Sequence, residues 1–313
     1  VDPRLEGGKL NGRTKEDLVK LVEVEGQECL LYRCFPVNAV FLRASWADEY
    51  GNCTAHREIG PTDLTAMAQA CRNSGGKVIV QVEKIVAGGT LDPKLVVIPG
   101  IYVDAIVVGS EAEHQQCMDA AYDGSLTGEF RAPADALAPL PLDARKVIAR
   151  RAAMELRPGA VVNLGVGIPE RVARVAAEEG ISQEMTLTVE AGSVGGVPRG
   201  GTQFGGAANP AAILPQNVQF DFYHGGGLDI ACLGMAEIAP GGDVNVSRFH
   251  GRLAGSGGFI DISQNAGEVV FCGTFTAHGL DAVCEDGKLV IVQEGAKKKF
   301  VNQVEHITFS GKY

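Results

Sequence analysis

A glutamate at the end of an apolar stretch is the residue best placed to do chemistry. Glu190 follows an expected strand at 186–189 and precedes the segment AGSVGG, so its carboxylate lies beside uncrowded backbone. Ligands of open α/β sheets bind beyond the carboxyl ends of the strands, which favours a ligand-facing role for a charged residue there. A carboxylate is ionised near neutral pH and needs no general base. We predict that Glu190 is catalytic; an exposed glutamate without a function is the simpler alternative.

Glycine-rich loops follow Glu190 in the chain. Glycine makes up 41 of the 313 residues, and clusters occur at 204–210, 224–229 and 254–259. Residues without a Cβ let backbone N–H groups approach a ligand, and N–H groups that face a developing oxyanion contribute strongly to catalysis. A tight turn is the alternative for any single cluster. The predicted oxyanion donors are the backbone amides of Gly205, Gly206, Gly226 and Gly227.

A second glycine motif precedes a predicted helix. Gly165, Val166 and Gly167 follow an expected strand at 160–164, and Pro169 suits the first position of the next helix. A helix N-terminus at such a turn binds anions, so this turn is a candidate site for a phosphate or an extended chain. G-x-G alone is a weak signal, and the full dinucleotide fingerprint is absent. Lys297, Lys298 and Lys299 form the one basic run; we interpret it as a solvated face, with phosphate binding as the alternative.

A serine hydrolase is a rival interpretation. His224 precedes three glycines, as in the oxyanion loop of esterases, and Ser193 lies in AGSVG, one residue away from the G-x-S-x-G elbow. However, Ala191 replaces the first glycine of that elbow, and the glycine loop should precede the nucleophile. The esterase therefore stays the weaker hypothesis.

The first part of the chain alternates strand and helix signals. The expected elements are strands at 39–43, 77–82 and 102–108 and a helix at 63–71. This pattern is typical of an α/β domain. Residues 132–143 (APADALAPLPLD) are rich in Ala, Pro and Leu, which indicates a semi-rigid linker. We therefore predict a first domain within 1–131 and a second at 144–313.

The second part of the chain begins with a helix that Asp143 can cap. The residues expected on its inner face are Ala144, Val147, Ile148 and Ala152. A helix after Pro169 should bury Val172, Val175 and Ala176. The further expected strands are 186–189, 230–233, 244–246, 269–272 and 289–293. The sequence therefore predicts an α/β fold with two lobes of similar size and open, mostly parallel sheets.

Composition limits the possible partners and the cellular location. The formal net charge of -10 argues against a general nucleic-acid or anionic-membrane surface, and no apolar run reaches the roughly 20 residues needed to span a bilayer. Eight cysteines are scattered without a C-x-x-C pair, so we predict reduced thiols, no metal site and a cytoplasmic location. The chain begins without Met at Val1, which suggests a fragment or one subunit.

These motifs, taken in order, resemble those of the family I coenzyme A (CoA) transferases, particularly the single-chain bacterial short-chain acyl-CoA:acetate, propionate or acetoacetate type. The resemblance runs along nearly the whole chain and is highly specific. It is carried by VDPR, GGKLN, NLGVGIP, TVEAGSVGG, QFDFYHGGGLDIA, GRLAGSGGFIDIS, VVFCGTFTA, KLVIVQEG and ITFSGK.

The resemblance implies a function, a mechanism and a site. Glu190 matches the family's nucleophile, which forms a glutamyl-CoA thioester during ping-pong transfer between an acyl-CoA and a short-chain carboxylate. The loops with Gly165, Val166 and Gly167 and with Gly255, Gly257 and Gly258 look like CoA-contacting segments. The resemblance implies that CoA is a substrate and is also bound in the covalent intermediate. It implies no tightly bound cofactor. The active site should lie between two CoA-transferase domains.

The resemblance also bears on assembly. Members of this type are longer, with an N-terminal glycine-rich segment and a C-terminal tail, so either a second chain or segment supplies the missing N-terminal part, or the sequence is truncated or partly processed. A homo-oligomer is expected too. A non-catalytic sensor of acyl-CoA or sugar phosphate on the same scaffold stays open, because a fold does not fix a function. The exchanged acids and the direction of transfer are not determined by these residues.

Overall fold

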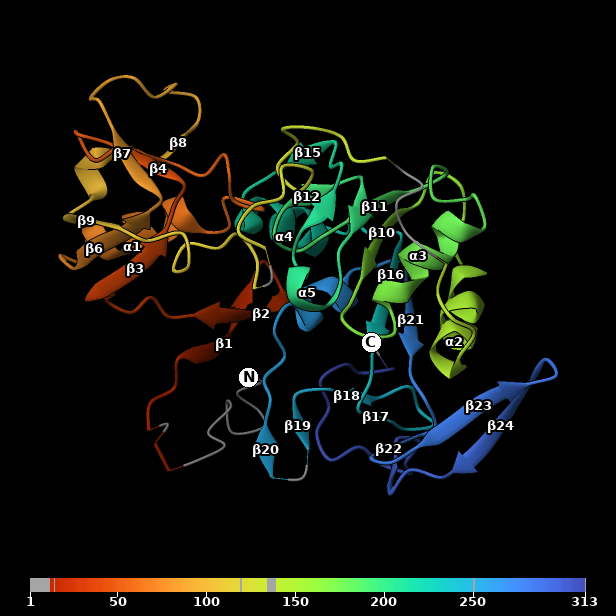
Figure 1. Cartoon of the computed structure of the whole chain (residues 1–313). Helices are drawn as coiled ribbons and strands as arrows, with labels where there is room; N and C mark the ends of the chain where they lie inside the picture. The colour runs from red at the N-terminus through yellow and green to blue at the C-terminus, as the bar shows by residue number, and fades with distance from the viewer. Residues whose placement is uncertain (1–11, 14, 119, 134–138, 250, 313) are drawn as a thin grey trace.

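The computed structural model describes residues 12–13, 15–118, 120–133, 139–249 and 251–312. A first lobe, residues 39–109, lies beside a larger lobe, residues 144–312 (Figure 1). The motifs VDPR and GGKLN and residues 134–138 of the expected linker lie outside the described residues, and the predicted domain boundaries stay a prediction. Within these ranges, no helix combines the length and the apolar character needed to cross a bilayer.

The first lobe is built on a parallel sheet with the order β3-β6-β9. Val78, Val80 and Val82 of the central strand are fully buried because helix α1 covers one face of this sheet. The predicted strands 39–43 and 77–82 are confirmed, whereas the third strand is shorter than expected. The elements up to this point are β1 (Val19–Val24), β2 (Gln27–Tyr32), β3 (Ala39–Arg43), β4 (Trp46–Asp48), β5 (Cys53–Thr54), α1 (Leu64–Asn73), β6 (Lys77–Val82), β7 (Lys84–Val86), β8 (Val96–Ile98), η2 (Gly100–Tyr102) and β9 (Ala105–Val108).

The larger lobe is built on a sheet of six strands with the order β15-β12-β11-β10-β16-β21. The strands β11, β10, β16 and β21 run parallel, so their carboxyl ends share one edge. The elements of this layer are α2 (Ala144–Ala153), β10 (Val161–Leu164), α3 (Glu170–Glu178), β11 (Thr186–Thr188), β12 (Ser193–Val194), β15 (Ala212–Ile213), α4 (Gln216–His224), β16 (Ile230–Gly234), α5 (Phe259–Gln264) and β21 (Glu268–Cys272). The fold class is α/β, as predicted.

Helices cover both faces of this sheet. Ile230 and Cys232 of β16 pack in a core with α2 and α3, while Ala231 and Leu233 pack with α4 and α5 on the other face. Successive side chains of a strand point to opposite faces, so a strand that is buried on both sides is an unbroken apolar run. The sequence Ile-Ala-Cys-Leu at 230–233 fits this arrangement, because it forms a strand although no polar residue alternates with the apolar ones.

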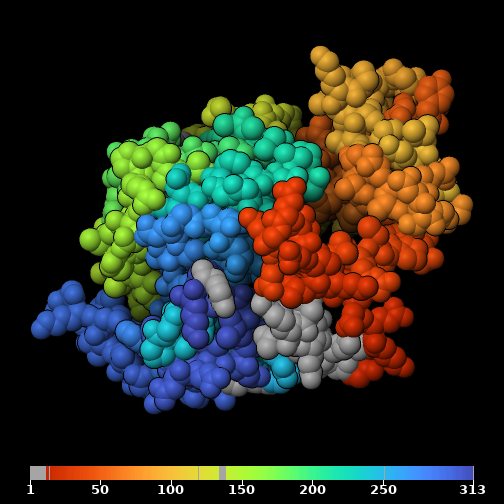
Figure 2. Space-filling view, turned by 180° about the vertical axis from the view of Figure 1, so that it is seen from behind, coloured from red at the N-terminus to blue at the C-terminus, as the bar shows by residue number. Residues whose placement is uncertain are grey.

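Short antiparallel ribbons complete the larger lobe. They contain β13 (Val197–Pro198), η3 (Gly201–Gln203), β14 (Ala207–Ala208), β17 (Glu237–Ile238), β18 (Val244–Asn245), β19 (Arg248–Phe249), β20 (Arg252–Leu253), β22 (Thr276–Ala277), β23 (Asp281–Glu285), β24 (Lys288–Gln293) and β25 (Lys297–Lys298). The β23–β24 hairpin projects from the body of the molecule (Figures 1 and 2). The apolar run 289–293 forms a strand, as predicted, but the strand is exposed along its length.

The first helix of the larger lobe is capped as predicted, and its buried face is only partly the predicted one: Ala152 is buried and Ile148 packs against the core. The Asp143 carboxylate accepts a hydrogen bond from the Lys146 amide at 2.7 Å. Val147, expected inside, is exposed, so that part of the prediction is wrong. The buried residues are Lys146, Ala149, Ala152 and Ala153. Small alanines allow α2 to approach its neighbours closely, while Lys146 buries its aliphatic stem and pairs with Glu178 at 2.6 Å.

Candidate active site

Glu190 lies in a tight turn between β11 and β12. The turn is closed by two backbone hydrogen bonds, from the Val189 amide to the Ser193 carbonyl at 2.9 Å and from the Gly192 amide to the Val189 carbonyl at 3.0 Å. Gly192 has a φ of +119°, and a Cβ placed on it would lie 1.8 Å from the carbonyl oxygen of Leu214. Only glycine fits there. The sequence AGS after Glu190 therefore fixes the direction in which its backbone leaves the strand.

The Glu190 carboxylate is packed against the glycine loop that precedes α5. A Cβ on Gly258 would lie 2.6 Å from the Glu190 Oε2 and 2.7 Å from the ring of Phe220. Burial raises the pKa of Glu190, because removing a carboxylate from water disfavours its charged form. Gly258 leaves the space that this side chain occupies.

We expect Glu190→Gln to raise the midpoint of thermal unfolding at pH 7 by about 2–4 °C. A raised pKa means that the folded protein holds the Glu190 proton more tightly than the unfolded chain does. Glu190 therefore stabilises the folded state at acid pH. This stabilisation is lost as the pH rises through the folded-state pKa of Glu190. The gain from glutamine should shrink as the pH falls through the folded-state pKa of Glu190 and be lost below its unfolded pKa of about 4.3. Thermal melts followed by circular dichroism across this range measure it.

Exposed Glu285 provides the control for this comparison. Glu285→Gln should leave the melting midpoint unchanged. A lower midpoint for Glu190→Gln at pH 7 would contradict the expected penalty for burying the charge.

A buried polar network holds the end of β11. The Tyr223 hydroxyl donates to Thr188 Oγ1 at 2.8 Å, and the Gln219 amide donates to the Tyr223 oxygen at 2.9 Å and to the Val189 carbonyl at 3.4 Å. The Asn163 amide on β10 donates to the same Tyr223 oxygen at 3.3 Å. No motif in the sequence indicated this network, although Gln219 and Tyr223 stand four residues apart on one helix. These contacts anchor the strand from which Glu190 extends.

The first lobe contacts the turn directly. A Cβ on Gly60 would lie 2.5 Å from the carbonyl oxygen of Ala191, which follows Glu190. Ile59 packs against Gly205, where its Cδ1 lies 3.3 Å from the position of an added Cβ. The Glu190 turn therefore lies at the junction of the two lobes, and Gly205 lies beside it.

Three of the four predicted oxyanion donors, Gly206, Gly226 and Gly227, have amides that donate hydrogen bonds within the protein. The amides of Gly226 and Gly227 donate to the carbonyl oxygens of Tyr223 and Phe222 at 3.0 and 2.9 Å, in the turn that ends α4. The Gly206 amide donates to Gln203 at 3.3 Å. An oxyanion would have to compete with these bonds. The oxyanion role of the four glycines stays a prediction.

The two loops predicted to contact CoA are positioned differently. The Gly165 amide donates to the Cys232 carbonyl at 2.8 Å, and the Gly167 amide donates to the Glu170 carboxylate at 3.2 Å, so a side chain of α3 already occupies part of this helix N-terminus. Val166 is exposed between them. Added Cβ atoms on Gly255 and Gly257 would meet open space. CoA contact by either loop stays a prediction.

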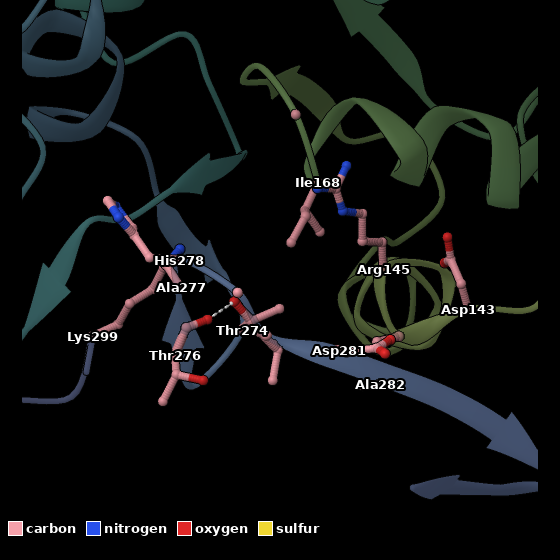
Figure 3. Close-up of a pocket in the computed structure, with 14 residues that line it drawn as sticks. Asp143, Arg145, Ile168, Thr274, Thr276, Ala277, His278, Asp281, Ala282 and Lys299 are labelled. Carbon is pink, nitrogen blue, oxygen red and sulfur yellow. Dashed lines mark hydrogen bonds between the residues drawn. The ribbon is translucent and has the colours of Figure 1, made fainter. Parts of the chain in front are cut away.

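A cavity of about 550 Å³ opens at the carboxyl ends of β10 and β21. Arg145 and Lys299 lie on opposite sides of it, with Thr274 and Thr276 between them (Figure 3). Burial, and then the charge of Arg145, lower the pKa of Lys299, whose ammonium donates to the Met235 carbonyl at 3.1 Å. Asp143 and Asp281 also line this cavity, so its wall carries two cationic and two anionic side chains. The two cations are the groups that could pair with an anionic ligand.

The cavity and Glu190 share one edge of the sheet. Gly167 follows β10 and lines the cavity, Thr274 follows β21 and also lines it, and Glu190 follows β11. The outer strands β11 and β21 are three strand spacings apart in the order β11-β10-β16-β21, a span of about 14 Å. An extended ligand that is anionic at one end can therefore lie along this edge with its other end near Glu190.

The geometry does not favour the serine hydrolase. Ser193 is fully buried at the start of β12, and the segment turns from one strand into another rather than into a helix. A nucleophile elbow needs an exposed serine at a strand-to-helix turn. His224 instead lies 3.3 Å from Asp261 on the molecular surface. The part of the chain that is described holds no cluster of three or more metal-ligating side chains.

The fold and this site define a class of protein: an α/β protein whose two lobes meet at a partly buried glutamate. A family model described as Coenzyme A transferase matches residues 5–109. The whole chain is 47% identical over 312 residues to the acetate CoA-transferase YdiF of Escherichia coli O157:H7. Along its whole length the chain is similar to members of the coenzyme A transferase family.

Two further comparisons also cover the whole of this chain. The chain is 47% identical over 319 residues to the caffeate CoA-transferase of Acetobacterium woodii, covering 100% of this chain and 61% of that protein. The crystal structure of YdiF from E. coli O157:H7 in a thioester complex with CoA superposes with a TM-score of 0.91 at 45% identity, covering 100% of this chain and 58% of that chain. The chain spans 59% of the length of YdiF itself.

Proposed function

We propose that the protein carrying this chain transfers CoA between a short-chain acyl-CoA and a free carboxylate, with Glu190 as the nucleophile. The observation that carries this proposal is a partly buried, strand-end carboxylate at the junction of two lobes, on the same sheet edge as a cavity lined by Arg145 and Lys299. The relatives named acetate and caffeate CoA-transferases support it.

The reaction proceeds by exchange of acyl bonds on Glu190. The carboxylate attacks the thioester carbonyl and forms a C–O bond, the C–S bond breaks, and CoA leaves as the thiolate, which gives an acyl-glutamyl anhydride. The thiolate then attacks the glutamyl carbonyl, which releases the acyl group as a free acid and leaves a glutamyl-CoA thioester. An acceptor carboxylate repeats both steps in reverse. No net proton, oxidant or reductant is required, and the kinetics are ping-pong.

The raised pKa of Glu190 suits this chemistry. Burial makes the ionised carboxylate more basic than an exposed one, and bond formation to an acyl carbon neutralises the charge that burial disfavours. The charge is transferred to the departing thiolate. Exclusion of water at the junction of the lobes also protects the anhydride from hydrolysis.

The cavity in Figure 3 is the proposed site for the nucleotide end of CoA. Arg145 and Lys299 would pair with its phosphate groups, and an anion there would favour the charged form of Lys299, whose pKa is lowered by burial and then by Arg145. The Gly167 turn lies between this cavity and Glu190, where the pantetheine chain would pass. This arrangement assigns a phosphate-binding role to Lys299 of the basic run, while Lys297 and Lys298 are exposed.

The acids exchanged are proposed to be small carboxylic acids, as in the relatives' names. A homo-oligomer and a cytoplasmic location stay predictions from the sequence. The non-catalytic sensor is the second candidate, because it would use the same cavity without forming a bond to Glu190.

Peptide mapping by mass spectrometry separates these two functions. The full-length protein is incubated with acetyl-CoA and no acceptor acid, reduced with borohydride, and digested. We expect a CoA-sized adduct, or its reduced form, on the peptide that contains Glu190. An unmodified peptide in protein that binds CoA would support the sensor and remove Glu190 as the nucleophile.

A further inference from the structure

Helix α4 contacts the surroundings of Glu190 in two ways. Gln219 and Tyr223 form hydrogen bonds with the end of β11 and the residue after it, which lead to Glu190. A Cβ added to Gly258 would lie 2.6 Å from the Glu190 carboxylate and 2.7 Å from the Phe220 ring, so these two groups border the same space. Side chains three or four residues apart share one face of a helix. The same side of α4 therefore faces both the backbone and the carboxylate of Glu190.

Gln219 binds the peptide unit that leads into Glu190. Its side-chain amide donates to the Val189 carbonyl at 3.4 Å, and the same carbonyl accepts from the Gly192 amide at 3.0 Å. A peptide unit is planar, so this carbonyl and the Glu190 N–H move together. Two donors on the carbonyl restrict the rotation of that plane, and with it the direction in which the Glu190 side chain leaves the turn. The bond from Gln219 is long, so its effect depends on how firmly the Gln219 amide is held.

Tyr223 holds that amide in place. The Tyr223 side chain is fully buried, and its oxygen accepts from Gln219 at 2.9 Å and from Asn163 at 3.3 Å. Its hydroxyl donates to Thr188 Oγ1 at 2.8 Å, and the Thr188 hydroxyl donates to the Val162 carbonyl at 3.0 Å. A tyrosine hydroxyl has one hydrogen to donate and two lone pairs, and all are used here. A buried network whose members are satisfied in this way is rigid.

The charge of Glu190 also acts on Tyr223. Burial raises the pKa of the Tyr223 hydroxyl and the charge of Glu190 raises it further, while the hydrogen bonds with Thr188, Asn163 and Gln219 lower it. The net shift is upward, so Tyr223 stays protonated at neutral pH. It therefore keeps the O–H that binds Thr188. The network keeps one arrangement of hydrogen bonds while Glu190 loses and regains its charge.

Resting on the proposed CoA transfer, we infer that Gln219 and Tyr223 are positioning residues, which hold the peptide unit before Glu190 and so keep its carboxylate where it attacks the thioester. Gln219 acts on the backbone directly, and Tyr223 acts through Gln219. Neither side chain takes part in bond exchange. A displacement of about 1 Å in a reacting group reduces the rate by about 100-fold, so loss of either contact lowers kcat rather than raising the KM of acyl-CoA.

Gln219→Met in the full-length protein tests this inference, because methionine keeps the length of the side chain but has no N–H to donate. We expect kcat to fall by about 10- to 100-fold while the KM of acetyl-CoA stays within about threefold. Tyr223→Phe removes only the hydroxyl and should lower kcat in the same way by about 3- to 10-fold. Asn217→Met, on the exposed side of α4, is the matched control and should change neither constant.

A second substitution separates positioning from a general structural role. Glu190→Asp already withdraws the carboxylate, so adding Gln219→Met to it should lower the residual kcat by less than about threefold. If Gln219 only stabilised the fold, the two losses would multiply. A further loss of about tenfold or more in the double variant, or an unchanged kcat in Gln219→Met alone, would overturn the inference. If Gln219→Met does not fold, Tyr223→Phe takes its place in this comparison.

The outcome stays decidable if the proposed function fails. If the full-length protein transfers no CoA, crystal structures of the unmodified protein and of the Gln219→Met variant decide. A Glu190 carboxylate that leaves its place beside Gly258 in the variant supports positioning by Gln219, and one that keeps its place overturns it.

Discussion

Glu190→Gln is expected to abolish CoA transfer, with a fall in kcat of about 10⁴-fold or more. Glutamine fills the same space beside Gly258 and Phe220, but its amide does not attack a thioester. Because both half-reactions pass through the carboxylate, no partial reaction should survive. Initial rates of acetyl-CoA consumption with an acceptor acid measure the loss, on freshly purified protein whose mass confirms that the glutamine is intact.

Glu190→Asp sharpens this test. It keeps the charge but withdraws the carboxylate by one methylene, and a displacement of about 1 Å reduces rates by about 100-fold or more. Glu285→Gln, on the exposed hairpin, is the matched control and should retain the full rate. Rates near the unmodified level in both Glu190 variants would exclude Glu190 as the nucleophile.

Gly258→Ala is expected to reduce transfer by about 100-fold without a matching loss of stability. The backbone of Gly258 has a φ of -75°, which alanine adopts without strain. Its added methyl group, however, would lie 2.6 Å from the Glu190 carboxylate oxygen and 2.7 Å from the Phe220 ring. The flexible carboxylate is the group that can move, so the nucleophile is displaced. Transfer kinetics and a thermal melt of the same preparation measure the two effects.

Gly241→Ala is the matched control for this substitution. An added Cβ at Gly241 meets nothing within 4 Å. This variant should transfer CoA at the unmodified rate. If Gly258→Ala also retained that rate, the loop before α5 would not define the position of the Glu190 carboxylate.

The parallel strands of both lobes were predictable because they are buried. The run 230–233 is apolar along its length because that strand is buried on both faces, whereas 77–82 (KVIVQV) buries every second residue, all of them valines. The capping residue Asp143 was predictable because its hydrogen bond to Lys146 is local in sequence. Glu190 stood out because a carboxylate directly followed an apolar strand and preceded glycine-rich backbone.

The burial of individual faces was not predictable in the same way. Apolar periodicity placed Val147 inside, yet α2 packs through its alanines and the stem of Lys146. The run 289–293 indicated a strand, and the strand formed, but in an exposed hairpin. Periodicity reports which residues can be buried, whereas the neighbouring elements decide which of them are covered.

The sequence by itself determined the α/β class, the main parallel strands and the position of Glu190 after one of them. Only the tertiary structure brought Gly258, Phe220 and Gly60 to the Glu190 turn and assembled the cavity shown in Figure 3. It also showed that the amides of Gly226 and Gly227 are hydrogen-bonded in the turn that ends α4. The physical reason is the range of the interactions. Strand propensity and caps depend on residues a few positions apart, while the burial of a carboxylate and the shape of a cavity depend on packing between segments far apart in the chain.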